Sequence, residues 1–156
     1  MNIRYTIGLT VLGLLLSACQ SNLSKGKTAD VRDAQDTQTQ VEENPFAAIE
    51  IPDMDRNYVS LTAEIARHEL TVIDFWASWC GPCRQEMPNM VALHNQFSSQ
   101  GLGIIGISLD KDYAAWKSAV AEMHMSWLQL SELRGWEDYT ARLFGVRSIP
   151  QTFLIN

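Results

Sequence analysis

The feature that most constrains this chain is an apolar strand that runs almost directly into two cysteines and then a helix. Residues 70–76 read Leu-Thr-Val-Ile-Asp-Phe-Trp, a β-rich and nearly continuous apolar run. Such a run is typical of a strand that is buried on both faces of a sheet. From Pro82 to about Ser98 the apolar period becomes three and four, which predicts a helix that Gly101 ends. Its apolar residues are Met87, Met90, Val91 and Phe97.

Strands and helices alternate through the rest of the folded region. We expect further strands over 102–109 and 151–155, and helices over 112–124 and 137–144, while 127–130 is compatible with either. Before them, short strands over 46–51 and 57–61 flank a turn, and Ser60 can cap a short helix over 61–68. This order predicts an α/β domain over 46–156, with a mostly parallel sheet and helices on both faces.

Residues 1–19 have the pattern of a secretion signal. Arg4 precedes an apolar core from Ile7 to Leu16, and this core is shorter than the about 20 residues that a spanning helix needs. The run Leu16-Ser17-Ala18-Cys19 resembles a bacterial lipoprotein processing site, in which Cys19 becomes the lipidated N-terminus. An ordinary cleaved signal, in which Cys19 has no role, stays open as the alternative.

Residues 20–45 predict a flexible linker. From Gln20 to Asn44 there are no aromatic residues, and small polar side chains dominate. Such a stretch cannot bury enough apolar surface to offset its ordering entropy. As a coil it would span roughly 25–30 Å, enough to hold a domain clear of lipid head groups.

Charge and cysteine number narrow the function. The formal net charge of -6 and the pI near 4.9 argue against a nucleic-acid partner, which requires clustered Lys and Arg. The chain has three cysteines. If lipid takes Cys19, one pair remains, Cys80 and Cys83, and outside the cytoplasm such a pair can be oxidised.

The placement of Cys80 and Cys83 favours thiol chemistry. At the start of a helix, free N–H groups and the helix dipole favour negative charge, and therefore the nucleophilic thiolate of Cys80. Pro82 fits the first helical turn, and Cys83 lies deeper in the helix. Two alternatives stay open, an inert structural disulfide or half of a zinc site. Zinc would need two more ligands, and the histidines show no paired spacing.

At this point a resemblance is clear. The segment Asp74-Phe-Trp-Ala-Ser-Trp-Cys-Gly-Pro-Cys83 resembles the active site of the thioredoxin superfamily. Residues 105–110, Gly135-Trp136 and Arg147-Ser-Ile-Pro150 resemble its extracytoplasmic TlpA/ResA-like branch. The resemblance covers 46–156 and implies a thioredoxin-like fold without the family's final strand and helix. We therefore expect the chain to be a fragment or a truncated product.

The resemblance also assigns roles. It makes Cys80 the attacking thiol, Cys83 the resolving thiol, and Asp74 a buried acid of raised pKa that deprotonates Cys83. It makes Pro150 a cis-proline and pairs the Ile149 backbone with substrate. The other residues expected to contact substrate are Trp79, Gly81 and Pro82. We expect Trp76 and Trp79 at the rim of the site, and Trp116, Trp127 and Trp136 in packing roles.

The expected function is that of a lipid-anchored thiol–disulfide oxidoreductase facing the periplasm or another extracytoplasmic space. It would reduce disulfides of envelope proteins, apocytochromes among them, and receive electrons from a membrane thiol carrier. No organic cofactor and no metal are implied. Two other functions stay open. One is a peroxide-reducing enzyme on the same fold, and the other is a non-enzymatic module that binds peptides in the Pro150 groove.

Overall fold

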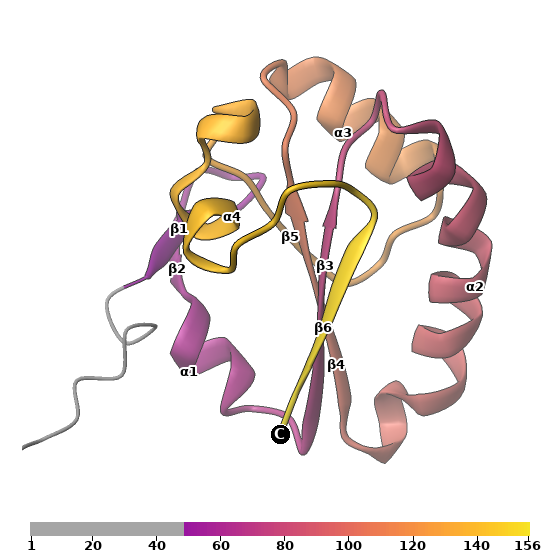
Figure 1. Cartoon of the computed structure of the whole chain (residues 1–156). Coiled ribbons are helices and arrows are strands. Elements are labelled where there is room, and N and C mark those ends of the chain that lie inside the picture. Colours follow the sequence, from indigo (N-terminus) through magenta and orange to yellow (C-terminus); the bar gives the residue numbers. More distant parts are fainter. Residues whose placement is uncertain (1–48) are drawn as a thin grey trace, which may run out of the picture. The chain divides into compact units, whose positions relative to one another are not determined.

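The computed structural model describes residues 49–156, whose main feature is a four-stranded sheet (Figure 1). Its strand order is β5-β4-β3-β6. The parallel strands are β3 (Leu70–Trp76), β4 (Leu102–Ser108) and β5 (Leu128–Leu130), and β6 (Gln151–Ile155) runs antiparallel to β3. This confirms the predicted thioredoxin-like, mostly parallel sheet, and residues 128–130 of the ambiguous segment 127–130 form a strand.

A short hairpin extends the β5 edge of this sheet. It consists of β1 (Glu50–Pro52) and β2 (Tyr58–Ser60), which pair antiparallel. Asp53 forms an isolated bridge with Leu130 of β5, and the Ser131 N–H donates to the Pro52 carbonyl at 3.0 Å. The hairpin therefore covers backbone groups at the edge of β5 that would otherwise be open to pairing.

Within residues 49–156, four helices cover the two faces of the sheet. Figure 1 shows α1 (Leu61–Ile65) and α4 (Tyr139–Leu143) on one side, and α2 (Gly81–Phe97) and α3 (Tyr113–Glu122) on the other. Two 3-10 turns, η1 (Ser98–Gln100) and η2 (Gly135–Glu137), lie in the connections. Side chains cap each helix as their types favour: the Ser60 hydroxyl accepts from the Ala63 N–H, as expected from the sequence.

Strand β3 lies at the centre of the core, with both faces buried. Phe75 packs on the α4 side against Phe144 and Phe153, at ring-centroid distances of 5.5 and 5.9 Å. Because side chains alternate along a strand, Asp74 and Trp76 point to the opposite face, which α2 and α3 cover. The sheet therefore places an acidic side chain beneath the helix that carries the cysteines.

The predictions for residues 1–45, including lipidation of Cys19, lie outside the described residues, and so does the start of the strand expected at 46. Over 49–156, no helix combines the length and the apolar character that a membrane span requires.

Candidate active site

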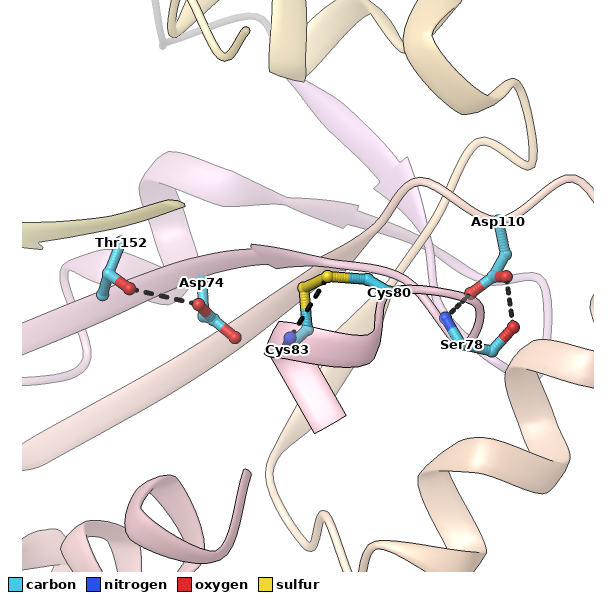
Figure 2. The surroundings of a disulfide bond; sticks show 6 residues. All are labelled: Asp74, Ser78, Cys80, Cys83, Asp110 and Thr152. Atoms are coloured by element: carbon cyan, nitrogen blue, oxygen red, sulfur yellow. Dashed lines mark hydrogen bonds between the residues drawn. A yellow bond between two sulfur atoms is a disulfide. The ribbon is translucent and has the colours of Figure 1, made fainter. Parts of the chain in front are cut away.

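Cys80 and Cys83 form a disulfide at the start of α2 (Figure 2). Strand β3 ends at Trp76, three residues follow, and Cys80 is the N-cap of the helix, where its sulfur accepts from the Cys83 N–H at 3.2 Å. Cys80 is 5% exposed and Cys83 only 1%. Both residues are therefore buried, and Cys80 is the slightly more exposed of the two, the order expected of an attacking and a resolving cysteine.

The helix terminus provides the electrostatics for thiol chemistry. The first N–H groups of a helix lack partners within it, and Pro82 occupies the first turn, where no N–H is needed. A thiolate on Cys80 would lie against these N–H groups, which stabilise negative charge. Among residues 49–156, no three His, Cys, Asp or Glu side chains are grouped as metal ligands would be.

Asp74 is a buried acid on the face of β3 that α2 covers. It is 4% exposed, and its Oδ1 accepts from the Thr152 hydroxyl at 3.2 Å. The pKa of Asp74 is raised to about 6, mainly by burial, while the bond from Thr152 opposes the rise and the charge of Glu86 adds to it. In Figure 2, Asp74 lies between Thr152 and Cys83. A carboxyl group with this pKa can exchange a proton near neutral pH.

Asp110 is a second buried acidic residue, and its role was not predicted from the sequence. It follows β4 and is 1% exposed. Its Oδ2 accepts from the Ser78 N–H at 2.9 Å and from the Ser108 hydroxyl at 2.7 Å, and its Oδ1 accepts from the Ser78 hydroxyl at 2.6 Å (Figure 2). Asp110 therefore holds the segment between β3 and Cys80 against the end of β4. The position of an acidic residue directly after a buried parallel strand could have indicated this role, because the carboxyl ends of parallel strands lie at one edge of the sheet.

The same network reaches the neighbouring strand. The Ser131 hydroxyl, just after β5, donates to the Ser108 carbonyl at 2.8 Å, and the Leu109 N–H donates to the Trp76 carbonyl at 2.8 Å. The ends of β3, β4 and β5 are thus joined by hydrogen bonds directly below the cysteine motif. A site built on linked strand ends is held more firmly than one on a free loop.

The tryptophans differ from the expectation in two cases. Trp76 is fully buried and donates its indole N–H to Gln129 at 3.1 Å, so its assignment to the rim was wrong. Trp136, expected in a packing role, is 46% exposed and lies beside Trp79, which is 56% exposed, with ring centroids 6.4 Å apart. Trp116 and Trp127 are buried, as expected.

A cleft of about 440 Å³ opens beside this tryptophan pair. Its lining comes from the segment before Cys80, from the end of β4 with the start of α3, and from η2. The lining residues are Ser78, Trp79, Leu109, Asp110, Lys111, Asp112, Ala115, Gly135 and Trp136.

The residues expected to contact substrate lie around the same edge of the sheet. The Ile149–Pro150 peptide bond is cis, the isomer implied by the resemblance. Pro150 precedes Gln151, which pairs with Phe75 near the end of β3, so the register places Pro150 toward the edge that carries the cysteines. Gly81 and Pro82 are exposed, and Ile149 is half-buried. Their contacts with substrate stay predictions.

The sheet order, the cysteine pair at the start of α2 and the acid beneath it define a thioredoxin-like protein with a candidate redox site. The chain belongs to the AhpC/TSA family, whose family model matches residues 43–156. Within that family its relatives are thiol–disulfide exchange proteins of the ResA and DsbE type, which confirms the resemblance drawn from the sequence.

Two relatives and one solved structure show the extent of the similarity. The thiol:disulfide interchange protein HelX of Rhodobacter capsulatus is 29% identical over 94 residues, which is 60% of this chain and 50% of HelX. DsbE of Pseudomonas aeruginosa is 31% identical over 114 residues, 72% of this chain and 59% of DsbE. A thiol-disulfide oxidoreductase from Bacteroides fragilis superposes with a TM-score of 0.64 at 28% identity, covering 69% of this chain and 80% of that one. The chain spans about half the length of curated relatives such as HelX and ResA.

Proposed function

We propose that this protein is a thiol–disulfide oxidoreductase that reduces disulfides in proteins outside the cytoplasm. The observation that carries the proposal is the Cys80–Cys83 disulfide at the start of α2, with Cys83 the less exposed of the two residues. The similarity of the chain to thiol:disulfide interchange proteins supports the same chemistry.

In the proposed reaction the reduced protein transfers two electrons to its substrate. The Cys80 thiolate attacks one sulfur of the substrate disulfide; a new S–S bond forms, and the other substrate sulfur leaves as a thiolate. Cys83, whose proton passes to Asp74, then attacks the Cys80 sulfur of the mixed disulfide and releases the second substrate thiolate. The substrate is now a dithiol, and the protein holds the Cys80–Cys83 disulfide described above.

We propose the reducing direction because Gly-Pro separates the cysteines, as in thioredoxin, whose potential is near about -270 mV. The cycle then needs a reductant for the Cys80–Cys83 disulfide, and we propose a thiol carrier of the membrane. It uses no organic cofactor or metal. The proposed substrates are envelope proteins with disulfides, with apocytochromes as one class that the resemblance implies.

The proposed location follows from the N-terminal sequence. Residues 1–19 act as a lipoprotein signal, Cys19 carries the lipid, and residues 20–45 link it to the domain that begins at 46. Because a single acyl chain binds a membrane only marginally, stable anchoring through Cys19 requires more than one chain.

The deciding experiment is the redox potential of the Cys80–Cys83 pair, measured by equilibration with glutathione or dithiothreitol. We expect a value near that of thioredoxin. A value near about -120 mV, that of the strong oxidant DsbA, would reverse the proposed direction of electron flow.

A second assay separates the proposed activity from its alternatives. The reduced protein should reduce insulin disulfides, and Cys80→Ser should abolish this activity. Single-turnover oxidation that is much faster with hydrogen peroxide than with a disulfide would instead indicate a peroxide-reducing enzyme. A Cys80→Ser variant that keeps full function in cells would indicate a peptide-binding module.

A further inference from the structure

The cleft beside Trp79 and Trp136 has the character of a binding site for an apolar side chain. Single exposed apolar residues are common, but here two indole rings lie side by side at the mouth of a hollow, next to a reactive cysteine. Ala115, which is exposed, contributes further apolar lining. Ligand pockets in proteins are typically concave and lined mainly by apolar and aromatic side chains.

Two of the acidic side chains that line the cleft already accept hydrogen bonds. Asp110 accepts hydrogen bonds from Ser78 and Ser108, and the Asp112 carboxylate accepts from the Ala115 N–H at 2.7 Å as the cap of α3. Lys111 passes close to Gly135, where an added Cβ would come within 2.5 Å of its Cε, so its aliphatic stem forms part of the wall. A ligand therefore meets mainly aromatic and aliphatic surface.

The distance that a substrate chain can span from Cys80 determines which of its side chains can enter the cleft. Trp79 directly precedes Cys80, and adjacent Cα atoms are about 3.8 Å apart. A substrate cysteine held in a mixed disulfide with Cys80 places the residues one and two positions away within roughly 7 Å of it. The occupant of the cleft is then the side chain that flanks the attacked cysteine.

We propose that this cleft selects protein disulfides whose cysteine is flanked by an aromatic or long aliphatic residue, with Trp136 as the specificity-determining side chain. The proposal rests on the proposed disulfide-reductase function. It makes the substrate an extended or unfolded polypeptide segment, since in a folded protein such a side chain is usually buried. Small disulfides, which lack a flanking residue, do not use the cleft.

The test compares three substrates and three variants. The substrates are two disulfide-linked peptides that differ only in Phe or Ser after the cysteine, and hydroxyethyl disulfide. The variants are Trp136→Ala, the milder Trp136→Phe, and Tyr58→Ala as the control, because Tyr58 is a 71% exposed aromatic on β2. Melting temperatures check that each variant is folded.

We expect Trp136→Ala to lower kcat/KM for the Phe peptide about tenfold, equivalent to about 1.4 kcal/mol, the scale of an interface aromatic. Rates on the Ser peptide and on hydroxyethyl disulfide should change less than about twofold. Trp136→Phe should keep most of the preference, and Tyr58→Ala should change none of the rates.

Three results would overturn the proposal. One is an equal loss on all three substrates, which would mean that Trp136 acts on Cys80 or on the fold. Another is no loss on the Phe peptide. The third is that the wild-type protein sediments as a dimer and Trp136→Ala sediments as a monomer. The cleft would then be occupied by a second copy of the chain and not by substrate.

The same substrates distinguish an error in the proposed redox function from an error in the proposed role of the cleft. If the wild-type protein reduces none of the substrates, the redox function is wrong, and the cleft is then tested by binding alone. The S-methylated Phe peptide should still bind the wild-type protein about tenfold more tightly than Trp136→Ala. Equal binding would overturn the cleft as well.

Discussion

At the scale of single residues, Asp74 couples stability to pH. Its pKa is about 6 in the folded protein and near the ordinary value of 3.8 in an unfolded chain. The folded state therefore holds this proton more tightly, so the contribution of Asp74 to stability is greatest below pH 4, falls as pH rises to about 6, and stays lower above it. Ionised Asp74 thus costs the fold up to about 3 kcal/mol at pH 7.

Replacing this carboxyl group should separate stability from activity. We expect Asp74→Asn to raise the free energy of unfolding at pH 7 by roughly 1–3 kcal/mol, and to have little effect at pH 3.5, because Asp74 is already protonated there. Resolution of the mixed disulfide by Cys83 should slow by about 10²-fold, the lower end for a lost proton acceptor. Urea unfolding of the oxidised protein at both pH values, and quenched-flow trapping of the mixed disulfide, measure the two effects.

Asp138 offers a matched control for Asp74. It is buried, burial raises its pKa to about 6, and it caps α4 by accepting from the Ala141 N–H at 2.8 Å. Asparagine is an equally good cap, so Asp138→Asn should reproduce the pH-dependent gain in stability. Slower resolution in Asp138→Asn as well would contradict a specific role for Asp74.

Asp110 is predicted to be a positioning residue. We expect Asp110→Ala to lower stability by about 1–3 kcal/mol, because the Ser78 N–H and two serine hydroxyls lose their acceptor. The rate at which iodoacetamide alkylates Cys80 should also shift in its pH profile, since the segment before Cys80 is released. Asp112→Asn, which changes an exposed helix cap nearby, is the control and should leave that pH profile unchanged. If the profile is also unchanged in Asp110→Ala, Asp110 contributes to stability alone.

At the scale of elements, a close approach of β4 and β5 depends on Gly106. A Cβ at this position would lie 2.3 Å from the Gln129 Oε1, the atom that accepts from the Trp76 indole. We expect Gly106→Ala to lower the free energy of unfolding by about 2–4 kcal/mol, from overpacking and a lost buried hydrogen bond. Chemical denaturation measures the loss.

A double-mutant cycle tests this explanation. In a Gln129→Ala background the same change at Gly106 should cost much less, because the clashing side chain is gone. Gly81→Ala is the contrasting control, since nothing lies within 4 Å of its added Cβ, and its cost should stay below about 1 kcal/mol. An additive cycle would mean that the backbone, and not Gln129, resists the substitution.

Most elements could be predicted from sequence because their signals are local. The change of the apolar period after Cys83 marks α2. Gly101, which adopts the left-handed conformation, marks the turn that follows this helix. The three-residue strand β5 could not be predicted, because a short apolar run becomes a strand only through its pairing with β4.

For the site, the sequence motif located the cysteines and Asp74, but side-chain exposure depends on tertiary contacts. Trp76 is buried because α2 and α3 cover its face of β3, while Trp136 is exposed because a 3-10 turn carries it to the surface. The Asp110 network likewise joins strand ends that are distant in sequence.

At the scale of the whole molecule, the N-terminal cysteine should determine where the domain acts. We expect the protein expressed in a Gram-negative host to partition into detergent, and Cys19→Ser to release it into the aqueous fraction without loss of insulin-reducing activity. Detergent phase separation and intact mass measure the effect, and an unlipidated wild-type protein in the aqueous phase would contradict the anchor.

The tryptophan pair also gives the molecule an optical signature. Two indole rings whose centroids are 6.4 Å apart and whose planes meet at 56° are close enough for their excited states to couple. The far-ultraviolet circular dichroism should therefore contain two bands of opposite sign that disappear in Trp136→Ala. Because a peptide side chain that enters the cleft would shift the rings, this exciton signal would report occupancy directly, without any added label.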